Sequence, residues 1–201
     1  VGDHEGSLGW YERSLKARQE ILDTLGPTNT RNRDVMNARR YVAQQLALLE
    51  RIDDAIEAYR RILPLARTLV TDNPTDARSR NDLARSLLEH GRILLIAEQS
   101  AGAVEPLREA AAGWKQAMER SSEGSGHDHV VARSLIDSNL FLGRALLMSD
   151  DPEAAREVHG ELAGLLREIR GNWPDNDSFA SQTRDAEILH EAILKELGRL
   201  D

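Results

Sequence analysis

A spacing of small and apolar residues recurs along the chain and predicts helices that pack in the same way. In DDAIEAYRRIL the small residue Ala55 is followed four positions later by Tyr59 and four further on by Leu63. The spacing occurs 48 residues earlier, 48 residues later and 51 residues after that, at Ser7/Tyr11/Leu15, Ala103/Leu107/Ala111 and Ala154/Val158/Leu162. Residues four apart share one helical face, and a small residue there allows a neighbouring helix to approach closely. Self-similarity at a fixed period indicates stacked helical units, none of which buries its apolar face alone.

Turn-forming segments divide the chain into eight predicted helices. GPTNT at 26–30, DNPTD at 72–76 and NWPDN at 172–176 place Pro beside residues that end one helix and cap the next. The connection SSEGSGHDH at 121–129 is longer and lacks Pro, so we expect a mobile loop there. The helices are predicted near 6–25, 31–50, 53–72, 76–98, 101–121, 130–148, 152–171 and 178–198. The predicted fold is therefore all-α.

The segment Arg33 to Leu63 resembles an enlarged tetratricopeptide repeat, of a type found in bacterial signalling proteins and in regions attached to serine/threonine kinases. In that family the first helix carries Leu-Gly near its middle and an apolar residue three positions later. The matching residues are Val42-Ala43 with Leu46, His90-Gly91 with Leu94, and Leu142-Gly143 with Leu146. The second helix carries a small residue, an aromatic residue and a helix-ending proline, matched by Ala55, Tyr59 and Pro74. The usual repeat has about 34 residues, so each helix here is expected to be roughly 10 Å longer.

The resemblance implies a right-handed α-α superhelix, a solenoid of about four antiparallel helix hairpins. We expect a single array over residues 1–201, with units at roughly 6–50, 53–98, 101–148 and 152–198. Both ends of the chain resemble the turn between two repeat helices, so we expect a fragment of a longer protein.

In the family the first helices line a concave surface, and the resemblance places candidate partner-binding residues there. They are Asn37, Arg40, Gln44, Arg85, Arg92, Arg144 and Lys195. Arg92 and Arg144 each follow the glycine at the helix centre and so take equivalent places. Guanidinium groups bind carboxylates bidentately, so arginines beside leucines suit an acidic, partly apolar peptide. The alternative is a solvated face, or one paired with the chain's own acidic residues.

Composition and charge narrow the classes of function. A net charge of −8 argues against a general binder of nucleic acid or anionic membranes. Cysteine is absent, which excludes disulfides and cysteine–zinc sites and fits a cytoplasmic protein. We find no signal peptide and no apolar run near the roughly 18 residues that a membrane span needs. Aromatic residues make up only 4 %, and β-branched runs are scarce, which argues against a sheet.

No residue pattern indicates an active site, a metal or a cofactor. His127, Asp128 and His129 could hold a metal but lack a distant third ligand, so a polar loop is the better interpretation. His90 and His190 take the apolar place before the helix-centre residue, and we expect partly buried core histidines.

The expected function is therefore a non-catalytic protein–protein interaction scaffold that presents a helical groove to a protein or peptide. One alternative is a sensing array that binds a ligand or peptide and controls an attached catalytic domain, such as a kinase. Another is a self-association module that forms homo-oligomers through the open ends of the solenoid.

Overall fold

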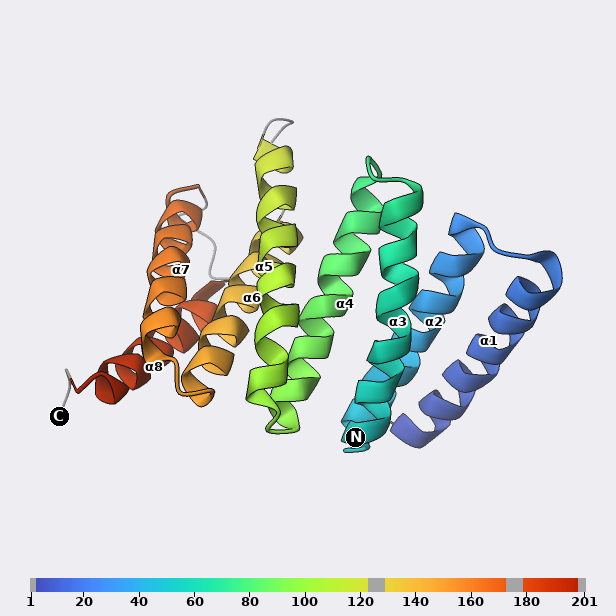
Figure 1. Ribbon diagram of the computed structural model, residues 1–201, viewed down its shortest axis with the longest axis horizontal. Helices are drawn as coiled ribbons and strands as arrows, with labels where there is room; N and C mark the ends of the chain where they lie inside the picture. The colour runs from blue at the N-terminus through green and yellow to red at the C-terminus, as the bar shows by residue number, and fades with distance from the viewer. Residues whose placement is uncertain (1–2, 123–128, 173–178, 199–201) are drawn as a thin grey trace. The chain divides into compact units, whose positions relative to one another are not determined.

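The computed structural model describes residues 3–122, 129–172 and 179–198, and these ranges form an all-α structure of eight helices (Figure 1). The helices are α1 (His4–Leu25), α2 (Asn29–Leu48), α3 (Ile52–Asp72), α4 (Ala77–Ile96), α5 (Ser100–Ser122), α6 (His129–Met148), α7 (Pro152–Asn172) and α8 (Ala180–Glu196). Every end lies within two residues of its predicted position, which confirms the all-α prediction. Most of the loop predicted to be mobile, including His127 and Asp128, lies outside the described residues.

The contacts divide the chain into two compact units, residues 1–97 and residues 98–201. In the first unit, α1 packs on α2, α2 on α3 and α3 on α4 (Figure 1). In the second unit, α5 packs on α6, α6 on α7 and α7 on α8, and α6 also contacts α8. Sequential antiparallel neighbours of this kind are consistent with a helical repeat array.

The backbone repeats most clearly in its turns. Glu50, Glu98 and Asp150 have positive φ angles of 58°, 58° and 62°, and Gly198 has 62°. This left-handed conformation commonly ends a helix and is usually taken by glycine. The first and third of these turns are closed by equivalent backbone hydrogen bonds. The Arg51 N–H donates to the Leu46 carbonyl, and the Asp151 N–H donates to the Leu146 carbonyl. Successive turns lie 48, 52 and 48 residues apart, and these intervals show which residues of the repeats correspond.

This register corrects one detail of the sequence pattern. The small residue of the last unit is Ala155, five positions after its turn, as Ala55 and Ala103 are after theirs. Ala155, Ala55 and Ala103 are all completely buried, whereas Ala154 is only half-buried. The prediction of Ala154 was wrong because two alanines are adjacent and spacing alone favoured the first. The turns at Glu50 and Glu98 precede those at Asp150 and Gly198 by 100 residues, so residues of α2 to α4 correspond to residues of α6 to α8 at an offset of 100.

Candidate partner-binding cleft

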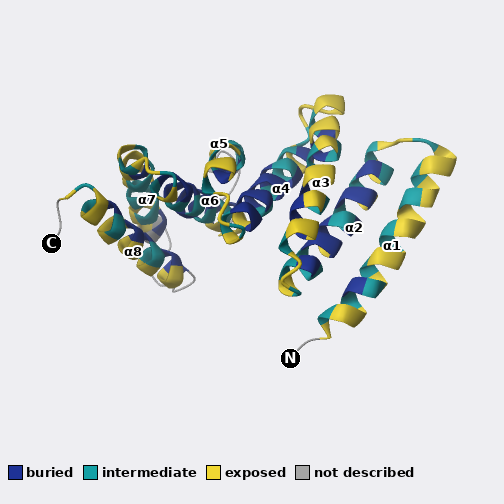
Figure 2. Ribbon diagram, turned by 60° about the horizontal axis from the view of Figure 1, so that its bottom comes forward, coloured by how far each residue is buried: buried dark blue, intermediate teal, exposed yellow. Residues whose placement is uncertain are grey.

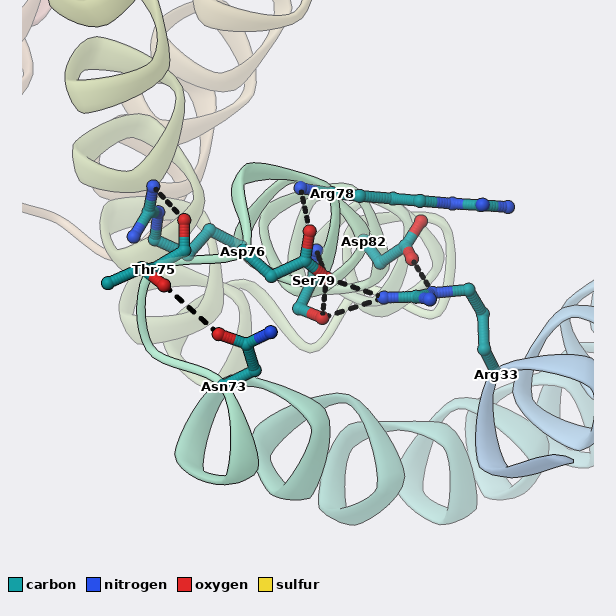
Figure 3. Close-up of polar contacts among 8 residues, drawn as sticks. Arg33, Asn73, Thr75, Asp76, Arg78, Ser79 and Asp82 are labelled. Carbon is teal, nitrogen blue, oxygen red and sulfur yellow. Dashed lines mark hydrogen bonds and ion pairs between the residues drawn. The ribbon is translucent and has the colours of Figure 1, made fainter. Parts of the chain in front are cut away.

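The N-terminus of α4 is tied to α2 by a polar cluster (Figure 3). Asp76 caps α4 by accepting hydrogen bonds from the N–H groups of Arg78 and Ser79. Arg33 of α2 lies 2.8 Å from the Asp76 carboxylate and 3.0 Å from that of Asp82, and it also donates to the Ser79 hydroxyl. The hydrogen bond from the Ser79 side chain is the main cause that lowers the pKa of Asp76. Because all these groups are satisfied together, the cluster fixes α4 along α2.

A second polar link joins α2, α3 and α4 near the other end of these helices. The Gln44 amide donates to one oxygen of Glu89, and the Tyr59 hydroxyl donates to the other, both at 3.2 Å. Burial raises the pKa of Glu89, while the nearby Arg40 guanidinium and the Tyr59 hydrogen bond oppose this rise. Burial, and then the Glu89 charge, also raise the pKa of Tyr59. One acidic side chain is thus held between three helices with both oxygens engaged.

These residues border a cleft of about 400 Å³ in the first unit. It is lined by Gln44, Gln45, Ala47, Leu48, Tyr59, Glu89, Arg92, Ile93 and Ile96. Leu48 and Ile96 are 57 % and 61 % exposed, so the lining includes two accessible apolar side chains. Arg92 is exposed, and Arg40 and Arg85 lie close enough to Glu89 for their charges to oppose the rise of its pKa. Two guanidinium groups therefore lie near one half-buried carboxyl group, and Arg92 lines the same cleft.

Five of the seven predicted partner-binding residues belong to this unit, and two of them line the cleft. Gln44 and Arg92 contribute to its wall. Arg40 is buried beside it, and its Nη1 has no hydrogen-bond partner among the described residues. Arg85 and Asn37 are half-buried on α4 and α2.

The other two predicted residues lie in the second unit. Arg144 is 3.6 Å from Asp185, and its guanidinium lies 5.8 Å from the centre of the Phe141 ring. Lys195 is exposed in the last turn of α8. Arg144 therefore makes the intramolecular pair that the sequence analysis left open as the alternative to ligand binding.

Sequence reasoning missed Glu89, although a signal for it exists. Arg85, Glu89 and Arg92 are spaced by four and three residues, which places them on one face of α4. That spacing indicates an acidic residue between two of the predicted arginines. It does not indicate the hydrogen bond from Tyr59, which comes from another helix.

The two histidines at equivalent places differ in burial. His90 is 8 % exposed and neither ring nitrogen has a hydrogen-bond partner among the described residues, while burial lowers its pKa. His190 is exposed, so the prediction of a partly buried residue was wrong for it. The His190 ring stacks on His159 of α7, with ring centres 4.5 Å apart. Within the part of the chain that the structure describes, α8 packs on α6 and α7 and no later helix covers its outer side.

No three histidine, aspartate or glutamate side chains in the described ranges are arranged to hold a metal ion. No helix among the same residues is long and apolar enough to span a membrane. Comparison of the sequence with protein-family models and with curated protein sequences finds no match.

Proposed function

We propose that this chain is a tetratricopeptide-like repeat array that acts as a non-catalytic scaffold and binds a partner protein or peptide. The cleft of the first unit is the proposed binding site. The observation that carries the proposal is that Gln44 and Arg92, chosen from the repeat pattern, line one cleft together with exposed Leu48 and Ile96. Few precisely placed polar groups within an apolar lining are typical of binding sites.

The charges around the cleft favour a partner that is acidic and partly apolar. Arg92 is exposed, and Arg40 and Arg85 add positive charge behind it. Both oxygens of Glu89 already accept hydrogen bonds from Gln44 and Tyr59, so this carboxyl group is engaged within the fold. A carboxylate of the partner would meet Arg92, and an adjacent apolar side chain would contact Leu48 and Ile96. A guanidinium–carboxylate pair that loses water at an interface contributes more than one left in solvent.

A second cleft serves as a comparison, because its charge is opposite. It measures about 420 Å³ in the second unit and its lining includes Lys115, Glu119, Glu161 and Glu168. An acidic peptide selected by charge should therefore avoid it.

The test is selection from a random peptide library displayed on phage, followed by affinity measurements on synthetic copies of the selected peptides. We expect sequences that combine Asp or Glu with a large apolar residue. Arg92→Glu should weaken their binding by about tenfold or more. Arg144→Glu is the matched control, since it makes the same change at the equivalent position outside the cleft, and it should leave affinity nearly unchanged. Peptides that bind wild type and Arg92→Glu equally would rule out this cleft as their site.

A further inference from the structure

The cleft of the second unit is bordered by three helices of that unit, α5, α6 and α7. The middle one, α6, packs on both of the others, and more than half of its residues are buried (Figure 2). Leu135 and Asn139 of α6 are buried residues of the cleft lining. Glu119 of α5, together with Glu161 and Glu168 of α7, contributes exposed residues to the same lining. The cleft therefore has a buried inner wall and carboxylates at its exposed edge.

In the first unit, an arginine of the chain itself occupies the equivalent place. Arg39 of α2 corresponds to Asn139 of α6 at the offset of 100, and α1 and α3 correspond to α5 and α7. The half-buried Arg39 guanidinium donates to the Arg61 carbonyl of α3 at 3.2 Å and to the Gln19 side chain of α1 at 3.4 Å. One guanidinium group thus bridges the two helices that flank α2.

In the second unit, the shorter side chain of Asn139 does not fill this place. Asn139 is 6 % exposed, and its Nδ2 donates to the Leu135 carbonyl at 2.9 Å. Its Oδ1 has no hydrogen-bond partner among the described residues. A polar atom of a buried side chain ordinarily has such a partner. The cleft therefore presents an acceptor for a donor that comes from outside the fold.

The charges that line the cleft favour a cation. Among its described lining residues, the carboxylates of Glu119, Glu161 and Glu168 outnumber the ammonium group of Lys115. Glu161 makes no ion pair within the described part of the chain. Lys115 corresponds to Gln19 at the 96-residue offset between Ser7 and Ala103, so its charge is the one that opposes a cation here. A cleft lined mainly by one sign of charge concentrates ligands of the other sign.

We propose that this cleft binds the side chain of an arginine from a partner protein or peptide. The guanidinium group would take the place that Arg39 fills in the first unit and donate to Asn139 Oδ1 and the Glu161 carboxylate. Its methylene groups would pack on Met118 and Leu165 of the lining. Five N–H donors in one plane allow a guanidinium to bind a carboxylate and still reach a second acceptor. A lysine ammonium is more strongly hydrated and lacks this planar fork.

Nuclear magnetic resonance titration of the full chain with N-acetyl-arginine amide tests the proposal. We expect the signals of the Asn139 side-chain amide and of the Gly164 and Leu165 backbone amides to shift. The dissociation constant should be on the order of millimolar, as suits a single side chain. The uncharged citrulline analogue should bind about tenfold more weakly, and the lysine analogue more weakly than the arginine probe. Equal or tighter binding by either analogue, or no shift at the cleft with the arginine probe, would overturn the proposal.

A pair of charge-matched variants tests whether binding depends on the cleft. Glu161→Gln should weaken binding of the arginine probe by about fivefold or more. Glu187→Gln removes the same charge at an exposed position of α8 outside the cleft and should leave binding unchanged. Arg92→Glu, in the cleft of the first unit, should also have no effect, so the two proposed sites are tested separately. Equal losses in Glu161→Gln and Glu187→Gln would rule out the cleft as the site.

Two further variants use the first unit as the template. Asn139→Arg should abolish binding, because the new side chain fills the cleft as Arg39 fills its equivalent. Lys115→Gln, which matches Gln19, should strengthen binding because the opposing charge is removed. Circular dichroism checks that both variants keep their helices. A folded Asn139→Arg variant that still binds the arginine probe would contradict the proposal.

Discussion

The pairs α2/α4 and α6/α8 occupy equivalent places in the two units, yet different chemistry holds them together. In the first unit, Arg33 binds Asp76 and Asp82, and Gln44 binds Glu89. In the second unit, the glycine at 143 lies against Leu189, whose Cδ2 is 2.7 Å from where a Cβ on residue 143 would sit. The first pair is joined by oriented polar groups, and the second by close apolar packing together with one long, half-exposed ion pair between Arg144 and Asp185.

Residues 100 positions apart are equivalent, so the two units can be compared residue by residue. Half-buried Glu89 corresponds to buried Leu189, Ala43 to Gly143, and paired Arg33 to exposed Arg133. The same backbone repeat therefore accepts either chemistry at its inner positions. The polar version depends on every partner being present, because a buried polar group without its hydrogen bond is costly. The apolar contact depends on how closely the side-chain volumes fill the space between the two helices.

The two units should differ most in how much free energy of unfolding is lost when their equivalent arginines, Arg33 and Arg133, are replaced. Arg33→Ala removes two ion pairs and leaves the carboxylate of Asp82, 12 % exposed, without its partner. We expect the free energy of unfolding to fall by about 2–4 kcal/mol. Arg133→Ala, at the exposed equivalent position, should change it by less than about 0.5 kcal/mol. Chemical denaturation of both variants gives the two values. Equal losses would mean that the polar cluster adds nothing beyond a helix-surface arginine.

The second prediction concerns the close approach of α6 and α8. In Gly143→Ala the new methyl group would displace the Leu189 side chain, which is 3 % exposed and has little room to move. Overpacking of this kind costs about 1–3 kcal/mol, which outweighs the gain in helix propensity of about 1 kcal/mol. Gly160→Ala in α7 meets nothing within 4 Å and should stabilise the protein by about 0.5–1 kcal/mol. Thermal or denaturant unfolding compares them, and stabilisation by both variants would contradict the tight contact.

The helices and their order could be predicted from sequence because they depend on local signals. Periodic apolar residues and Pro-containing turns placed every helix end within two residues. The turns themselves could not be predicted, because Glu50, Glu98 and Asp150 take a conformation that usually indicates glycine. Because the turn positions were not known from the sequence, nothing in it decided whether Ala154 or Ala155 is the buried small residue.

The cleft was only partly predictable. Gln44 and Arg92 follow from the repeat pattern, but a glutamate in an amphipathic helix is ordinarily interpreted as a surface residue. The Tyr59 hydroxyl, thirty residues away, donates to half-buried Glu89, and pairings of that kind depend on how helices pack. The exposure of His190 was missed for a related reason, since sequence periodicity does not reveal which side of a helix is covered among the described residues.

A smaller effect is expected at His90 and depends on pH. Burial lowers the pKa of His90 in the folded state, so the unfolded chain binds the proton first as the pH falls below about 6.5. The folded state should therefore lose stability as the pH falls through about 6.5 and below. His90→Leu, which installs the residue found at the equivalent position 142, should remove this part of the loss. The free energy of unfolding of this variant should also rise by about 1 kcal/mol at neutral pH, because two buried ring nitrogens that have no hydrogen-bond partner among the described residues are removed. The measurement is denaturant unfolding at several pH values, and an unchanged pH slope would contradict the assignment.

The smallest effect compares the turns that close the equivalent hairpins in the two units. Glu50 and Asp150 hold φ at 58° and 62°, where a side chain beyond glycine costs about 1 kcal/mol, with a smaller cost for Asp than for Glu. Replacement by glycine relieves this strain but gives the unfolded chain more freedom, which offsets part of the gain. We expect Glu50→Gly to stabilise by about 0.5 kcal/mol and Asp150→Gly by less. Gly198→Ala, the reverse change at the equivalent turn where φ is also 62°, should destabilise by about 1 kcal/mol. If Glu50→Gly destabilised the protein instead, the Glu50 side chain would have to hold the turn through an interaction worth more than the backbone strain.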